Sequence, residues 1–192
     1  GTPTGKGFSK PYCYHIDQFE SLRPVFMQVM KYARAMGLDM IQGDHEDAPG
    51  QLELNWMYDD VLRNADRLST YRQICAQVAR EFNLIACFMT KPFMGVSASG
   101  CHTNMSLWTG GKDKVNKLGH KSLPAMDNVF TYVEGGKNTF MPDTKDVQLP
   151  GKVGLKAIGG VMKHLGALTA IGSSTVNSYR RLWDQGFWAP VY

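Results

Sequence analysis

The stretch of sequence that decides the fold is DHEDAPGQLE, residues 44–53. A strand-like apolar run at 38–42 leads into it, and a short apolar alternation at 52–56 overlaps its end. The Pro49-Gly50 pair is typical of a turn, because proline fixes one backbone angle and glycine tolerates left-handed conformations. The stretch therefore predicts two strands that return on each other through a turn.

Acidic side chains gather at the end of these two predicted strands. Alternate residues of a strand point to the same side, so Asp44 and Glu46 share a face, and the turn lets Glu53 return beside them. Carboxylate oxygens are the ligands that Mg²⁺ and Mn²⁺ prefer in proteins. A solvated acidic turn has the same composition, so the residues alone leave both interpretations open.

Three longer segments have the period of amphipathic helices, and two shorter ones have the length of strands. Apolar side chains recur at three- and four-residue spacing over 19–36, 59–82 and 153–171, which predicts helices. A continuous apolar run at 84–89 and an alternating pattern at 102–108 predict two further strands. This pattern predicts an α+β fold in which long helices pack on one side of an antiparallel sheet.

Residues 109–150 stand apart from these elements. They are polar, rich in Gly, Pro, Lys and Asp, and without a clear period. A segment of this length inside a compact domain is expected to be an insertion or a functional lid, and a disordered surface loop explains its composition equally well.

The composition excludes several classes of protein. The chain has 192 residues, of which 43% are hydrophobic and 20% charged, with a formal net charge of +4, and its length suits one large domain or two small ones. Its charges are scattered, which argues against a nucleic-acid binder, and no apolar run approaches the length of a membrane span. Its four cysteines form no close pair, which predicts free thiols and a cytoplasmic protein.

A second group of polar residues follows the predicted strand at 84–89. Residues 95–100 are a small-residue loop whose backbone N–H groups can approach an anion closely. His102, Asn104, Ser106 and Trp108 then alternate onto one face of the next predicted strand. Taken singly, His102 is equally well explained as an ordinary histidine and Trp108 as a core residue.

A third group is NSYRRL, residues 177–182, which follows the last predicted helix. The planar fork of one of its two guanidinium groups suits a carboxylate or a transferring phosphoryl group. Paired arginines after a helix can also simply be solvated, and the residues alone do not choose between these interpretations.

In this order, the three groups resemble the catalytic domain of the glutamine synthetase family. Residues 46–53 are similar to its E-x-A-P-G-Q-x-E metal segment, and 91–108 to its K-P…G-S-G-x-H-x-H-x-S-L-W ATP segment. Residues 159–181 are similar to its G-G-x-x-K-H…N-S-Y-K-R run. The resemblance implies a glutamine synthetase-like fold and an ATP-dependent ligase. In that reaction the γ-carboxylate of glutamate takes the γ-phosphoryl group of ATP, and ammonia or a small alkylamine then displaces phosphate.

The resemblance also implies a role for each matching residue. The implied ligands of Mg²⁺ or Mn²⁺ are Glu46, Glu53 and His102. The implied nucleotide-binding residues are Tyr58, His102, Asn104, Ser106 and Trp108, with adenine between Tyr58 and the Ser106–Trp108 side. The implied glutamate-binding residues are Ser97, Ala98, Glu53 and Arg181. The implied catalytic residues are Arg181 and Trp188.

Three departures from the family pattern bear on the choice of amine. Ser97-Ala98 replaces the Asn-Gly of the common ammonia-using enzymes, and Asn104 replaces a histidine, so that position cannot act as a cation or a base. Trp188 stands where the family has the glutamate that helps to hold ammonium. An indole can shelter a methyl group or hold an alkylammonium by a cation–π contact. The pattern resembles the branch with γ-glutamylmethylamide synthetase and the type III glutamate–ammonia ligases, which makes methylamine the first candidate substrate.

Residues 1–192 are expected to be an incomplete catalytic domain. The family's N-terminal β-grasp domain, its first metal-binding Glu-x-Glu segment and its last arginines and glutamate are not in this sequence. Family members are ring dodecamers that complete each site between subunits, so we expect this piece alone to be inactive and to bind metal weakly. Its strand edges at 83–89 and 102–108 are expected to recruit another chain. A second class of function also fits the residues, namely a non-catalytic relative that acts as a structural or regulatory oligomer.

Overall fold

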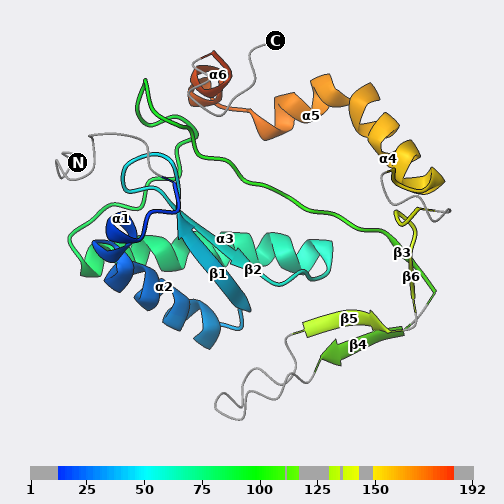
Figure 1. Cartoon of the computed structure of the whole chain (residues 1–192), viewed down its shortest axis with the longest axis horizontal. Coiled ribbons are helices and arrows are strands. Elements are labelled where there is room, and N and C mark those ends of the chain that lie inside the picture. The colour runs from blue at the N-terminus through cyan, green and yellow to red at the C-terminus, as the bar shows by residue number, and fades with distance from the viewer. Residues whose placement is uncertain (1–12, 111, 117–129, 135, 143–148, 184–192) are drawn as a thin grey trace.

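A computed structural model describes residues 13–110, 112–116, 130–134, 136–142 and 149–183. These residues form helices and small antiparallel sheets (Figure 1), so the predicted α+β class is confirmed. The strands are antiparallel as predicted, and within the described residues they pair two by two. The pairs are β1 (Met40–His45) with β2 (Leu52–Trp56), β3 (Trp108–Thr109) with β6 (Lys137–Asn138), and β4 (Lys112–Asn116) with β5 (Phe130–Glu134).

The first predicted helix is divided in two, into α1 (Ile16–Glu20) and α2 (Arg23–Ala35). Pro24 lies in the first turn of α2, where its missing N–H costs no hydrogen bond. In one continuous helix the ring of Pro24 would press against the preceding turn, so the helix starts afresh at this point. Gly37 follows α2 with a φ of 81°, the left-handed conformation that commonly ends a helix.

The predicted turn joins β1 to β2. Gly50 has a φ of 73°, which side-chain-bearing residues rarely adopt, and the N–H of Gln51 donates to the carbonyl of Ala48 at 3.0 Å. The strands pair in a register that sets Asp44 opposite Glu53. Successive residues of β2 then point to opposite faces, so one face is free for apolar contacts and the other carries the carboxylates.

The apolar face of this sheet belongs to the hydrophobic core. Leu52, Leu54 and Trp56 of β2 pack against side chains from α2, from α3 (Val61–Glu81) and from the chain entering β1. The buried members of the core are Phe26, Val29, Met30, Ala33, Leu38, Met40, Ile74 and Val78. The apolar stripe of α2 is thus confirmed, and that of α3 is confirmed at Ile74 and Val78, whereas Val61 and Leu62 at the start of α3 are exposed. These two helices pack against one face of a sheet as predicted.

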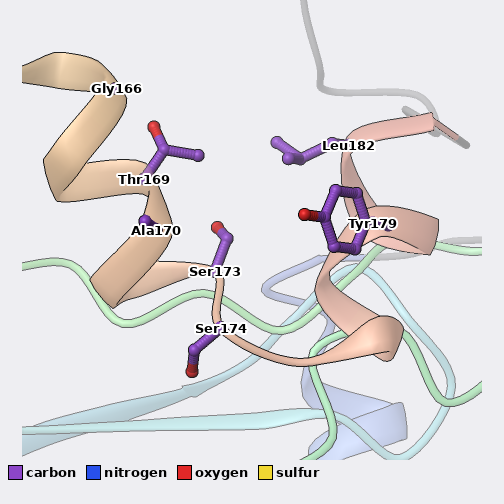
Figure 2. Close-up of a pocket in the computed structure, with 7 residues that line it drawn as sticks. All are labelled: Gly166, Thr169, Ala170, Ser173, Ser174, Tyr179 and Leu182. Atoms are coloured by element: carbon purple, nitrogen blue, oxygen red, sulfur yellow. The ribbon is translucent and has the colours of Figure 1, made fainter.

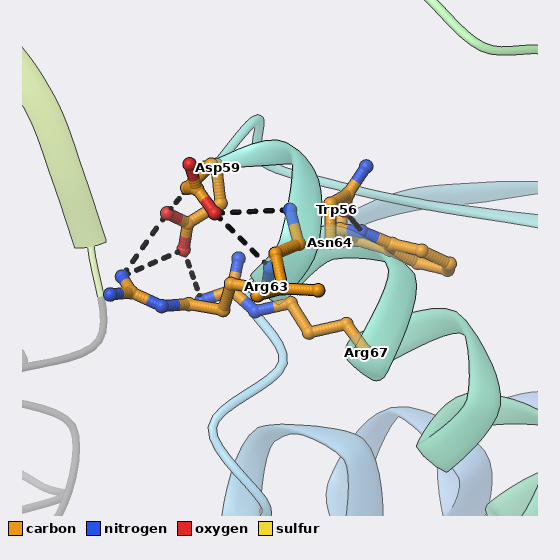
Figure 3. A network of polar contacts seen from close by, with 7 residues as sticks. Trp56, Asp59, Arg63, Asn64 and Arg67 are labelled. Atoms are coloured by element: carbon orange, nitrogen blue, oxygen red, sulfur yellow. Dashed lines mark hydrogen bonds and ion pairs between the residues drawn. The ribbon is translucent and has the colours of Figure 1, made fainter.

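A polar network fixes the start of α3 beside the end of β2 (Figure 3). The Asp59 side chain is fully buried, and one of its oxygens lies 2.8 Å from Nη2 of Arg67, while the other lies 3.1 Å from Nη1 of Arg63. Burial lowers the pKa of the Arg67 guanidinium, and the charge of Asp59 opposes that shift. Nε1 of Trp56 donates to Oδ1 of Asn64 at 2.5 Å. The Trp56–Asn64 bond therefore ties β2 to α3, and the buried Asp59–Arg67 pair holds the connecting residues on the helix. Removing one partner of that pair would leave an uncompensated charge.

The two strands predicted at 84–89 and 102–108 are wrong for most of their length. Residues 84–89 and 101–107 have no ladder partner in the described part of the chain, and only Trp108 and Thr109 form a strand, β3. An apolar run of strand length becomes a strand only where a neighbouring strand takes its hydrogen bonds. The segment 109–150, predicted as an insertion or lid, contains β4, β5 and β6, and its role stays a prediction.

The last predicted helix is also divided, into α4 (Lys152–Lys163) and α5 (Leu165–Gly172), and α6 (Val176–Trp183) follows. In Figure 1, α4 and α5 lie apart from α2, α3 and the β1–β2 sheet, so their predicted packing on a sheet is wrong for the described residues. Their apolar stripe is exposed over Val153, Leu155, Ile158, Val161, Met162, Leu165, Leu168 and Ile171. Among the described residues, none of the helices has the length and apolar character that crossing a bilayer requires.

A substitution at Gly43 tests this packing, because Gly43 lies on the core face of β1 against the ring of Phe26. A Cβ atom at this position would overlap that ring and lie 2.8 Å from the carbonyl oxygen of Glu53. We expect Gly43→Ala to lower the free energy of unfolding by about 1–3 kcal/mol, the cost of overpacking a close contact. Urea unfolding measures this change.

Gly160→Ala in α4 is the matched control. A Cβ there would meet nothing within 4 Å, so we expect the free energy of unfolding to stay level or to rise by about 0.5–1 kcal/mol. Equal losses of stability in the two variants would contradict the account of the Gly43–Phe26 contact.

Candidate active site

Three carboxylates lie on the face of β1–β2 that points away from the core. Asp44 and Glu53 stand opposite each other across the pair. The N–H of Glu46 donates to the carbonyl of Gln51 at 2.8 Å, which continues the pairing beyond β1 and brings Glu46 to the same side. Burial, followed by the nearby charge of Glu53, raises the pKa of Glu46. The predicted gathering of these side chains therefore agrees with the register.

The Glu46–Glu53 pair fits the donor chemistry of a hard divalent cation, because it offers several carboxylate oxygens at one place. Within the described ranges, no three His, Cys, Asp or Glu side chains cluster closely enough to hold one metal ion. The structure thus brings together two of the three predicted metal ligands, and His102 is not beside them.

Tyr14 is a neighbour of these carboxylates that the sequence patterns did not indicate. Its N–H donates to the carbonyl of His45 at 2.7 Å, and its φ of 61° is unusual for a residue with a side chain. The charge of Glu46, followed by burial and by further charges of which Asp44 and Glu53 are two, raises the pKa of the Tyr14 phenol. The hydroxyl is therefore a protonated donor near the carboxylates. No periodicity or motif in the first residues of the chain marks it.

The small-residue loop is fastened to the turn between β1 and β2. Nε2 of Gln51 donates to the carbonyl of Ala98 at 3.1 Å and to the hydroxyl of Ser99 at 3.4 Å. The hydroxyl of Ser97 donates to the carboxylate of Asp47, a residue that is only 5% exposed. Residues 46–51, which join β1 to β2, are called the carboxylate turn. Two predicted substrate-binding residues, Ser97 and Ala98, are therefore held beside this turn. Gln51 and Asp47 lie inside the quoted motif, but their partners could not be read from it.

The same loop is closed on itself at its base. The N–H of Ser99 donates to the carbonyl of Thr90 at 2.9 Å. The side chain of Lys91 is almost fully buried, and its ammonium group donates to the carbonyl of Val96 at 2.5 Å. A buried cation on a backbone carbonyl fixes the path of the loop, because leaving either group unpaired would be costly.

Helix α6 is joined to the base of this loop through Asn177. Its Oδ1 accepts from the N–H of Lys91 at 2.6 Å and from the hydroxyl of Thr90 at 3.0 Å. Its Nδ2 donates to the carbonyl of Lys91 at 2.8 Å. The predicted third group of residues therefore lies against the second group, across 86 positions of sequence.

Arg181 and His102 flank Gly100 at the far end of the loop. A Cβ placed on Gly100 would lie 3.8 Å from Nη2 of Arg181 and 3.7 Å from Nε2 of His102. Arg181 is half-buried and His102 is exposed. The structure thus brings together a guanidinium, an imidazole and the loop backbone, a set of groups that suits an anionic ligand.

The predicted adenine-binding residues are not brought together. Tyr58 is 66% exposed and lies between β2 and α3, whereas Trp108 begins β3, which stands apart from both in Figure 1. Trp108 and Ser106 are in contact, because Nε1 of Trp108 donates to the hydroxyl of Ser106 at 3.0 Å. Asn104 is exposed. Trp188 lies outside the described residues.

A separate hollow of about 280 Å³ lies between α5 and α6 (Figure 2). Its lining is small and hydroxyl-rich, and comprises Gly166, Thr169, Ala170, Ser173, Ser174, Tyr179 and Leu182. It contains none of the predicted site residues. None of these lining residues has a charged side chain, and the hydroxyl of Thr169 donates to the carbonyl of Leu165 within α5 at 2.8 Å.

Comparison with known proteins gives a consistent match. The model of a family described as "Glutamine synthetase, catalytic domain" matches residues 3–122 and 128–192. A glutamine synthetase of Rhizobium leguminosarum bv. phaseoli is 35% identical over 170 residues, which are 88% of this chain and 34% of that protein. A glutamate–methylamine ligase of Methyloversatilis universalis is 32% identical over 193 residues, 98% of this chain and 38% of that protein.

Two solved structures are similar in fold. One, described as "Apo GmaS without ligand", has a TM-score of 0.72 and 31% identity and covers 94% of this chain and 37% of its own. The other, "GmaS/ADP complex-Conformation 1", has a TM-score of 0.73 and 29% identity and covers 93% of this chain and 36% of its own. The chain therefore spans little more than a third of the length of the relatives that it matches.

The raised pKa of Glu46 predicts how stability depends on pH. The folded protein binds this proton more tightly than the unfolded chain does, so Glu46 lowers stability as the pH rises from its ordinary value of 4.5 through its raised folded value. We expect Glu46→Gln to be more stable than the wild type near neutral pH and to lose this part of the pH dependence. Thermal unfolding across this pH range measures both effects.

Glu20→Gln is the control, because Glu20 is an exposed carboxylate paired with Arg23 at 2.9 Å. We expect it to change the unfolding profile little, as exposed pairs contribute about 0–1 kcal/mol. A Glu46→Gln variant less stable than the wild type near neutral pH would contradict the predicted crowding of carboxylates.

Proposed function

The chain belongs to the glutamine synthetase family, and we propose that its full-length protein joins ammonia or a small alkylamine to the γ-carboxylate of glutamate with ATP as co-substrate. One observation carries the proposal. The carboxylate turn, the loop after Lys91 and the helix bearing Arg181 are joined by direct hydrogen bonds, and each lies in a segment that the family model matches. In the proposed reaction the γ-carboxylate oxygen of glutamate bonds to the γ-phosphorus of ATP and ADP leaves. The amine nitrogen then bonds to the acyl carbon, phosphate leaves and the amine gives up a proton.

The proposed metal site uses Glu46 and Glu53, with His102 as a ligand of a second ion. The two carboxylates lie on the same face of the strand pair, and the charge of Glu53 contributes to the raised pKa of Glu46. A bound Mg²⁺ or Mn²⁺ would offset the repulsion between them. When bound, such an ion supplies charge neutralisation for the phosphate oxygens. Remaining ligands would come from parts of the full-length protein beyond this sequence, which accords with its share of the relatives' length.

The proposed glutamate site lies between the loop and α6. Arg181 offers a planar fork with fixed geometry, which suits bidentate binding of a carboxylate. Ser97 and Ala98 would offer their backbone groups to the substrate from the segment that Gln51 holds. We assign Tyr58, Asn104, Ser106 and Trp108 to the nucleotide on the resemblance, and the similarity to a structure described as an ADP complex supports a nucleotide site in this family.

We further propose a cytoplasmic homo-oligomer, a ring dodecamer by family resemblance, whose site is completed by a neighbouring subunit. The amine itself depends on Trp188, which replaces an anionic side chain by an indole. That exchange weakens a site for ammonium and suits a methylammonium or its neutral amine. Relatives named for each of the two activities are about equally similar to this chain, at 35% and 32% identity.

Steady-state turnover of the full-length protein with ammonia and with methylamine tests the proposal. We expect kcat/KM to favour methylamine, and Trp188→Glu to shift that preference toward ammonia by about ten-fold, roughly 1.4 kcal/mol, the size of a cation–π contact. Trp188→Phe is the control, because it keeps an aromatic face and should shift the preference less.

The outcomes separate the alternatives. A wild type that strongly prefers ammonia would contradict the role given to Trp188 while leaving the ligase reaction intact. No ADP formation with any amine, in the presence of glutamate and either metal, would favour the non-catalytic oligomer instead.

A further inference from the structure

We propose that Asn177 is a positioning residue, whose side-chain amide docks α6 on the base of the loop and thereby sets where the Arg181 guanidinium stands. The kinetic part of this inference rests on the proposed function, and its structural part does not. The carrying observation is that one side chain makes three hydrogen bonds to two consecutive residues, Thr90 and Lys91.

The bonding pattern uses both ends of the carboxamide. Oδ1 accepts from the N–H of Lys91 at 2.6 Å, and Nδ2 donates to the carbonyl of the same residue at 2.8 Å. The amide of Asn177 therefore bonds both the N–H and the carbonyl of Lys91. A residue on a neighbouring antiparallel strand bonds the residue opposite it in the same way. Among the uncharged side chains, only Asn and Gln carry such an adjacent acceptor and donor, and an Asp at this position could not donate.

The spacing of residues along α6 links the contact of Asn177 to the position of Arg181. Asn177 and Arg181 are four residues apart on α6, so both side chains lie on the same face of the helix. Asn177 meets the first residues of the loop, and Arg181 lies beside Gly100 at its end. The two ends are themselves joined, because Ser99 donates to the carbonyl of Thr90 at 2.9 Å. A shift of α6 along the loop would therefore move the guanidinium away from Gly100.

The other hydrogen bonds described for α6 do not fix its position. The Ser178 N–H and the Thr175 side chain bond each other at the start of the helix, with 3.3 Å between Ser178 N and Thr175 Oγ1. These bonds cap the helix but reach no other element. The bonds of Asn177, by contrast, join α6 to the loop.

The test uses the full-length protein with Asn177→Ala, Asn177→Asp and, as a matched control, Val176→Ala. Val176 is the neighbouring residue of α6 and is 79% exposed, so we expect this control to behave as the wild type. We expect Asn177→Ala to raise the KM for glutamate about ten-fold with a smaller change in kcat, because substrate binding is lost through a displaced guanidinium. Asn177→Asp should give a comparable increase, since it removes the donor and adds a charge.

A double-mutant cycle shows whether the effect passes through Arg181. In an Arg181→Lys background we expect Asn177→Ala to change the KM for glutamate less than two-fold, because the residue that it positions is already altered. Additive effects in the two backgrounds would overturn the inference. So would an Asn177→Ala variant that unfolds at a lower temperature but keeps the wild-type KM, since that is the result of a merely structural contact.

Hydrogen exchange keeps the inference testable if the wild type proves to have no ligase activity. We expect Asn177→Ala to speed amide exchange over residues 90–100 and over α6, and to leave α2 and α3 unchanged. Unaltered exchange in all these segments would overturn the docking role, whereas inactivity of the wild type with faster exchange in the variant would overturn only the proposed function.

Discussion

The antiparallel register of β1 and β2 is the constraint on which the rest of the structure depends. With Asp44 opposite Glu53, the alternation of β2 turns Leu54 to the core and Glu53 to the other face. A slip of one residue would exchange the two faces and bury the carboxylates. Gly43 holds this register from the core side, because only a residue without a side chain leaves room for the ring of Phe26.

From this hairpin, the candidate site extends outward through side chains that bond to backbone groups. Gln51 reaches Ala98 in the loop, and Asn177 reaches the base of the same loop from α6. Each amide satisfies backbone groups that a loop cannot pair for itself. The three segments that resemble the family motifs are therefore joined by hydrogen bonds, although 47 and 86 positions of sequence separate the bonded residues in these two contacts.

The sequence predicted the parts of the fold that depend on local pattern. The stripes of α2 and α3, the turn at Gly50 and the shared face of Asp44 and Glu53 all follow from period and turn chemistry. The strands predicted at 84–89 and 102–108 were wrong for most of their length, because a strand depends on a partner that no local pattern reveals. The roles of Asn177 and Tyr14 were missed for a similar reason, since each depends on a contact distant in sequence.

In the proposed ligase, the carboxylate end of this hairpin binds a divalent metal ion. Electron paramagnetic resonance of Mn²⁺ added to the full-length protein and to its Glu53→Gln variant tests this role of the hairpin. We expect the wild type to remove free Mn²⁺ from solution and the variant to bind it about ten-fold or more weakly, as is typical when a carboxylate ligand is neutralised. Equal binding by both proteins would rule out a metal site at Glu53.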